Sequence, residues 1–244
     1  MPEVIFALLR TLNTLMQGRV WRAVLAPAVF SLVLWLGLAW WGLASLVGWL
    51  MDMPPMTLLV AWGAIWVAQL LAYMGAWMLV FALAYLTSSV LAAIFIMPSL
   101  IKLVAASDYP DVAAMGADSF VGAVGNSLRA TLLFVVGWLL MVPLWLIPGM
   151  SLILPVLLMG WYNRRTFAYD ALSLHATDAE WRRLYDENKR GLFMLGLVMA
   201  LLAHVPILGL FVPTLAALAF VHFGLDVLRR SRGGAVVTIE GEVV

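Results

Sequence analysis

The fold is decided by one segment of the chain, residues 129–165, which reads RATLLFVVGWLLMVPLWLIPGMSLILPVLLMGWYNRR. Between its basic ends, Ala130–Asn163 holds no charged residue and is interrupted only at Pro148-Gly149. The two arms, Ala130–Ile147 and Met150–Tyr162, contain 18 and 13 residues, which is about 27 and 20 Å of helix. A bilayer core is about 30 Å thick. We therefore expect a helical hairpin that enters a membrane and turns back before crossing it fully.

The composition indicates an integral membrane protein. Of the 244 residues, 65% are hydrophobic, and the mean hydropathy is +1.03, whereas a soluble domain is about half apolar. The chain has no cysteine, which excludes a disulfide framework, a thiolate metal site and cysteine-based catalysis. No face carries enough basic residues for binding to nucleic acid.

The rest of the chain repeats the pattern of a basic segment, an apolar hairpin and another basic segment. Residues 2–16 have the spacing of an amphipathic helix that lies in the membrane interface. The charge-free runs at residues 23–51 and 56–97 are long enough to span a bilayer, and a last hairpin covers residues 191–226. We predict an all-α membrane protein with a single helical domain over residues 1–232. The Gly-rich, polar residues 233–244 are expected to form a disordered tail.

Two further expectations concern where helices start and stop. The run 56–97 is too long for one simple span, so we expect it to bend at Gly75 or at residues 87–89 and to end at Pro98. Thr177, with Glu180 three residues later, is typical of a capping box at the start of a helix.

The distribution of basic residues predicts the orientation. The 14 lysines and arginines fall within residues 10–22, 102–129, 164–190 and 229–232, at the feet of the hairpins, and the outer turns have none. The positive-inside rule then places both termini and both polar loops in the cytoplasm. An aromatic belt is expected at the outer turn of the first hairpin, formed by Trp40, Trp41, Trp49, Trp62 and Trp66.

Motifs of catalysis are weak or missing. The three histidines, His175, His204 and His222, have no metal-ligand spacing, and the chain contains no nucleophile elbow or Gly-rich phosphate loop. We therefore expect no enzymatic activity, no metal and no cofactor. The apolar runs also lack a relay of buried acids, which favours a passive path over a proton-driven one.

Basic residues beside helix starts are the stronger functional signal. Gly18, Arg19 and Arg22 precede or open the first long helix, and Arg129 opens the short hairpin. A guanidinium beside the free N–H groups of a helix start favours an oxyanion. The alternative is that these arginines only anchor the helices at the membrane surface. Prolines inside the apolar runs leave a similar choice between a permeation path lined by helix ends and simple re-entrant turns.

Four short stretches resemble the CysZ sulfate-permease family, the bacterial branch of the etoposide-induced-protein membrane family. The basic turn and helix start at 18–27, GRVWRAVLAP, is the first. The others are the Ile-Pro-Gly tip at 147–149 with Pro155 following, the segment 161–170, and VPILGLFVP at 205–213. The sequence departs from the family pattern at Trp21, where an arginine is usual, at residues 98–100, and at Gly209 in place of an asparagine.

The resemblance implies two long transmembrane helices plus two partly penetrating helical hairpins, with the termini cytoplasmic. It also implies a channel-like permease that carries sulfate or a related oxyanion across the bacterial inner membrane for cysteine synthesis. Such a protein would assemble as a homo-oligomer among membrane lipids and bind its anion near Gly18, Arg19 and Arg22. Two alternatives stay open: a path for a different anion or solute, and a membrane-organising protein without transport.

Overall fold

The computed structural model describes residues 2–16, 18, 20–116, 120–147, 149–205 and 208–233. Every regular element within these ranges is a helix, so the all-α prediction is confirmed for this part of the chain. The tail expected to be disordered, 233–244, lies outside the described residues except for Gly233. The single domain over residues 1–232 stays a prediction.

The helices follow one another with short connections. Their bounds are α1 Pro2–Met16, α2 Trp21–Met51, α3 Met56–Ala61, α4 Ile65–Leu91, a π-helical segment Ala92–Ile96, α5 Met97–Asp108, α6 Phe120–Met141, a 3₁₀ segment Val142–Leu146, α7 Met150–Ser173, α8 Asp178–Ala203 and α9 Leu208–Ser231.

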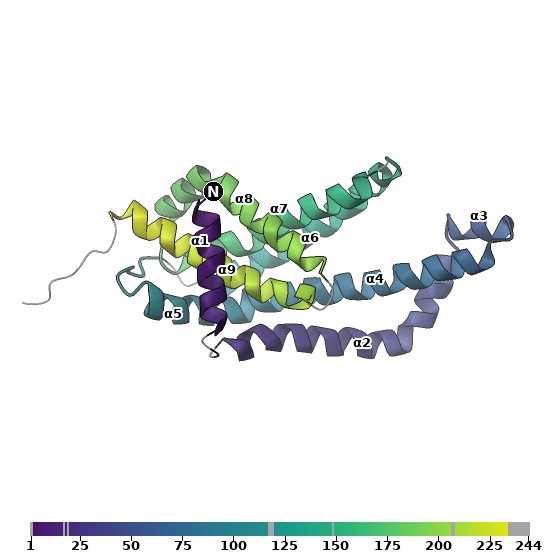
Figure 1. Ribbon diagram of the computed structural model, residues 1–244, viewed down its shortest axis with the longest axis horizontal. Helices are drawn as coiled ribbons and strands as arrows, with labels where there is room; N and C mark the ends of the chain where they lie inside the picture. Colours follow the sequence, from purple (N-terminus) through teal and green to yellow (C-terminus); the bar gives the residue numbers. More distant parts are fainter. Residues whose placement is uncertain are drawn as a thin grey trace, which may run out of the picture.

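Two long hairpins extend in the same direction from a common bundle (Figure 1). One is formed by α2 and α4, with the short α3 at its tip, and the other by α6 and α7. The N-terminus and the end of α9 lie at the opposite end of the molecule, where α1 crosses α9 at a steep angle. This crossing is the geometry expected of an interfacial helix beside membrane-spanning ones.

Among the described residues, four helical segments are long and apolar enough to cross a membrane: Trp21–Met51, Ile65–Asp108, Val121–Leu146 and Leu208–Ser231. The segment Val121–Leu146 is longer than the 18-residue arm expected from the sequence. The charge-free arm was expected to begin at Ala130, directly after Arg129. In the structure Arg129 lies inside helix α6, which already starts at Phe120. With 26 residues, this segment exceeds the roughly 20 needed to span a bilayer. Its partial penetration is therefore not supported by length.

The end expected for the run 56–97 is also wrong. Helix α4 continues through Gly75 and Ser88, and the helical path runs on past Pro98 to Asp108. A π-helical segment, Ala92–Ile96, precedes the proline, and Pro98 occupies the first turn of α5. Because the helical path is continuous there, the missing N–H of Pro98 removes one backbone hydrogen bond without ending the helix. Within the 129–165 hairpin, Gly149 has a φ of +83°, which agrees with the expected break, while Pro148 lies outside the described residues.

Helix α9 forms the centre of the bundle. Of the four candidate spans it is the most enclosed, with 72% of its most apolar window buried by other helices. It packs against α1, α8, α7, α5, α2 and α4. Helices α7 and α8 approach closely at Gly160 and Gly196, where a methyl group added to Gly196 would lie 2.4 Å from the Gly160 carbonyl oxygen. Small residues allow such backbone contact in membrane bundles.

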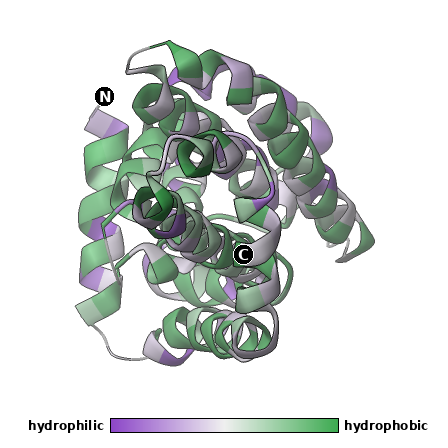
Figure 2. Cartoon of the chain, turned by 90° about the vertical axis from the view of Figure 1, so that its right-hand side faces the viewer, coloured by the Kyte–Doolittle hydropathy of each residue, from purple (hydrophilic) through white to green (hydrophobic). Residues whose placement is uncertain are grey.

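Large apolar side chains cover the outside of the hairpins. Figure 2, which looks along the long axis, shows hydrophobic residues over most of the helical surface and not only inside the bundle. The tryptophans predicted to form an outer belt are all exposed, with Trp40, Trp41 and Trp62 at 86%, 87% and 78%. Such a surface is stable in lipid and would aggregate in water.

Candidate functional site

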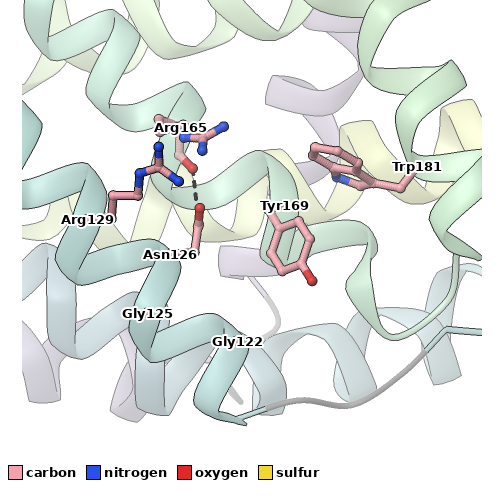
Figure 3. Close-up of a pocket in the computed structure, with 7 residues that line it drawn as sticks. All are labelled: Gly122, Gly125, Asn126, Arg129, Arg165, Tyr169 and Trp181. Carbon is pink, nitrogen blue, oxygen red and sulfur yellow. Dashed lines mark hydrogen bonds between the residues drawn. The ribbon is translucent and has the colours of Figure 1, made fainter.

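A pocket of about 380 Å³ lies between α6, α7 and the first turn of α8 (Figure 3). It combines glycines, two arginines, an asparagine and two aromatic side chains. Its lining residues are Gly122, Gly125, Asn126, Arg129, Arg165, Tyr169 and Trp181.

Helical spacing brings these side chains to one place. On α6, Gly122, Gly125 and Arg129 follow a spacing of three and four residues, which is one face of a helix. On α7, Arg165 and Tyr169 are four residues apart and share a face in the same way. The two helices are joined at the pocket by Asn126, whose Nδ2 donates to the carbonyl oxygens of Arg165 and Thr166 at 3.2 and 3.3 Å.

The two arginines give the pocket a positive charge. They come from α6 and α7 and lie on the same side of the pocket, away from Trp181 (Figure 3). Among the described residues, neither Arg129 nor Arg165 has a carboxylate within 4 Å, whereas Arg229 is 2.7 Å from Asp111. A guanidinium has five N–H donors and no acceptor. Two guanidinium groups without acidic partners leave donors that can bind an anion, and planar oxyanions or tetrahedral ones with paired oxygens suit their geometry.

Aromatic rings close the side formed by α8. Tyr169 meets Trp181 edge to face at 5.3 Å between ring centroids, and Trp181 stacks on Tyr185 at 5.2 Å. The guanidinium of Arg164 lies 5.6 Å from the Tyr185 ring centroid. The Nε1 of Trp181 is buried and has no hydrogen-bond partner in the described structure. The indole N–H is therefore an unsatisfied donor beside this site.

Comparison with known proteins identifies the family of the chain. A family model described as sulfate transporter CysZ/etoposide-induced protein 2.4 matches residues 7–213. The chain belongs to this family. The matched range runs from α1 into α9 and contains the whole arginine pocket. No curated protein and no solved structure matches the chain.

Membership of the CysZ family, together with the four apolar helical segments, makes the chain a multi-pass membrane protein of a transporter-like family. The membrane class predicted from composition is thus confirmed, as is the family to which the four short stretches pointed.

The anion-binding residues expected from the sequence lie in two places in this CysZ-family chain. Arg129 lines the pocket. Gly18 has a φ of +70° before α2, Arg22 is exposed on the first turn of α2, and Arg19 lies outside the described residues. None of the pocket residues comes from the turn at 18–22. The structure therefore does not join Arg129 to that turn, and a role for Gly18, Arg19 and Arg22 in anion binding stays a prediction.

Of the seven lining residues, sequence reasoning assigned only Arg129 to an anion site and missed the other six: Gly122, Gly125, Asn126, Arg165, Tyr169 and Trp181. The sequence did contain a signal for Arg165. Arg129 and Arg165 lie at the two ends of the same charge-free hairpin, and antiparallel arms bring the two ends of a hairpin together. Asn126 comes from a segment expected to be a polar loop, and its contribution depends on α6 extending into that segment. Trp181 lies in the first turn of α8, where a helix was expected, but no sequence signal linked this turn to Arg129.

A buried acid follows Tyr169 on α7. Asp170 is 3% exposed, and neither of its carboxylate oxygens has a hydrogen-bond partner among the described residues. Burial raises the pKa of the Asp170 carboxyl to about 8. The group is therefore mostly neutral at pH 7, and it does not cancel the positive charge of the neighbouring arginines.

Proposed function

We propose that the chain is a sulfate permease that conducts the anion passively across the bacterial inner membrane and supplies sulfur for cysteine synthesis. In this proposal both termini are cytoplasmic, the protein works as a homo-oligomer among lipids, and no catalytic step takes place. The observation that supports it best is the pocket in which Arg129 and Arg165 have no acidic partner within the described structure. Family membership supports the transport class.

The pocket suits capture of a doubly charged oxyanion. Two guanidinium groups match the two charges of sulfate, and each can donate a pair of parallel hydrogen bonds to oxygen. The rings of Tyr169 and Trp181 line the pocket and exclude part of the water around the anion. In such a partly dehydrated site the attraction is stronger than in bulk water. Loss of one guanidinium is expected to weaken binding by about 1.5–3 kcal/mol, roughly 10- to 100-fold.

The test is uptake of radiolabelled sulfate into liposomes that contain the purified protein. Arg129→Gln and Arg165→Gln are expected to reduce flux about tenfold or more. Arg183→Gln is the matched control, since this arginine is exposed and already pairs with Glu187 at 2.9 Å. Arg22→Ala tests the turn at 18–22 in the same assay.

The outcomes separate the competing functions. Sulfate flux that falls in the two pocket variants and resists excess chloride supports the permease. Flux that is lost only in Arg22→Ala moves the anion site to the first turn. Preferential uptake of another anion keeps the transport class and replaces the substrate. A folded wild-type protein without flux of any anion overturns transport and leaves a membrane-organising role.

A further inference from the structure

A second group of polar side chains is buried between α4, α6 and α7. The phenol oxygen of Tyr162 lies at its centre, close to the hydroxyls of Ser89, Thr131 and Thr166. The Thr131 hydroxyl is 3.2 Å from it. Ser89, Tyr162 and Thr166 have no exposed surface. We call these four residues the Tyr162 cluster.

The polar region continues from the cluster toward α8. Asn163, the residue after Tyr162, accepts a hydrogen bond from the Tyr85 hydroxyl at 2.9 Å. Its amide donates to the carbonyl oxygen of Gly196 at 3.2 Å. All of these groups are neutral, and they come from α4, α7 and α8. A neutral polar region inside an otherwise apolar bundle is costly unless its groups have partners.

The hydroxyls here are incompletely satisfied. Ser89, Ser127 and Thr166 are fully buried. The hydroxyls of Ser89 and Thr166 have only the Tyr162 phenol oxygen beside them, and the Ser127 hydroxyl has no hydrogen-bond partner among the described residues. Serine and threonine in a helix commonly donate to the carbonyl four residues earlier, as Thr131 does to Ser127 at 2.8 Å. Ser89, Ser127 and Thr166 do not use this local solution. Buried polar groups of this kind are normally satisfied by internal water or by a ligand.

The cluster adjoins the arginine pocket. Asn126 lines the pocket and donates to the carbonyl oxygen of Thr166, and Ser127 follows it in α6. On α7, Arg165 of the pocket precedes Thr166 of the cluster. The two sites therefore occupy neighbouring faces of the same pair of helices, one charged and accessible, the other neutral and buried.

We propose that the Tyr162 cluster is a buried, hydrated binding site for a small oxyanion and forms the next step of the permeation path after the arginine pocket. The assignment of the ligand rests on the proposed function. Hydroxyl and amide donors replace part of the anion's water without holding it by charge. Conduction requires such weaker sites, since an ion must be able to leave each site it enters.

Thiol labelling tests this proposal without depending on flux. The chain has no natural cysteine, so Ser89→Cys and Thr166→Cys each introduce a single thiol at the cluster. The probe is a small methanethiosulfonate reagent that carries a sulfonate. Ser31→Cys is the matched negative control, because Ser31 is buried in α2 and donates to the carbonyl of Ala28 in its own helix. Gly125→Cys is the positive control at the pocket, where an added side chain meets no atom within 4 Å.

In proteoliposomes, Ser89→Cys and Thr166→Cys are expected to react at least about tenfold faster than Ser31→Cys, since a thiol must meet water to ionise and react. Added sulfate is expected to slow both reactions.

Reaction at Gly125→Cys with none at Ser89→Cys or Thr166→Cys overturns the proposal, and Ser127→Cys replaces either variant that fails to fold. Labelling unaffected by sulfate overturns the anion site. If the wild type conducts sulfate but Ser89→Cys and Thr166→Cys are not labelled, the buried site is refuted and the permease stands. If both variants are labelled and sulfate slows the labelling, but the wild type conducts no sulfate, the permease is refuted and the buried site stands.

Discussion

Arg232 holds Glu180 by two parallel hydrogen bonds, from Nε to Oε1 and from Nη2 to Oε2, each 2.9 Å long. Arg232 directly follows α9, and Glu180 lies in the first turn of α8, where it completes the predicted capping box with Thr177. The same arginine donates to the carbonyl oxygen of Ala113 at 2.8 Å. One side chain of the basic tail therefore joins three segments beside Trp181 of the pocket.

This ion pair predicts a pH-dependent stability. Hydrogen bonding to Arg232 lowers the pKa of the Glu180 carboxyl from 4.5 to about 2. Because the folded-state pKa is the lower one, the stabilisation is present above pH 4.5 and is lost as the pH falls toward 2. Glu180→Gln, which retains a capping side chain, is expected to lower the thermal midpoint at pH 7 and to approach the wild type near pH 3.

Thermal unfolding in detergent at several pH values measures this effect. Glu187→Gln is the control, since its pair with Arg183 is exposed and exposed pairs contribute little. Equal midpoints for Glu180→Gln and the wild type at pH 7 would show that the pair does not stabilise the fold.

The buried Asp170 predicts the opposite dependence. Its pKa rises from 3.8 in the unfolded chain to about 8 in the folded one, so the carboxyl costs stability increasingly as the pH rises from about 4 to 8. Asp170→Asn removes the ionisable group and keeps its shape. We expect a midpoint raised by about 3 °C or more at pH 8, with no gain at pH 4. A lower midpoint at pH 8 would show that the ionised form has a partner in the folded protein.

The contact between α7 and α8 predicts a steric effect. A methyl group at Gly196 would lie 2.4 Å from the carbonyl oxygen of Gly160, so Gly196→Ala forces the helices apart. The expected loss of stability is about 1–3 kcal/mol. Gly42→Ala in α2 is the matched control, because no atom lies within 4 Å of the added carbon and alanine favours helix. Stability would be measured by thermal unfolding, and equal midpoints for the two variants would contradict the close packing.

Helix α1 is fixed to α9 by a shared carboxylate. Asp226 lies 3.3 Å from Arg10 of α1 and 2.5 Å from Arg230. Asp226→Asn removes the charge that both arginines share, and α1 is expected to open locally. Amide hydrogen exchange in α1 should then accelerate by about tenfold or more, while peptides of α6 keep their rates. Asp186→Asn on the exposed face of α8 is the control, and unchanged exchange in α1 would show that the Asp226 carboxylate does not hold this helix.

The local pattern predicted several elements correctly. Apolar runs over residues 23–51 and 129–165 correspond to α2 and to the α6–α7 hairpin, and Thr177 caps α8 as its spacing with Glu180 indicates. Helix ends were predicted less well. A charge such as Arg129 does not mark a helix boundary, because a charged side chain can extend from the surface of a continuing helix. Pro98 does not end the helical path either, because the π-helical segment before it joins α4 to α5 without a break.

The sequence by itself determined the membrane class, the helical elements and the family, because hydrophobic length and short motifs are properties of neighbouring residues. Only the tertiary structure decided which polar groups meet. Arg129 and Arg165 share a pocket because α6 and α7 are antiparallel, and Tyr162 meets Ser89 because α4 packs on the same pair. Asp170 has no hydrogen-bond partner among the described residues, and its burial too depends on helices that are distant along the chain. Side-chain spacing within one helix cannot specify such contacts, which depend on how separate helices pack.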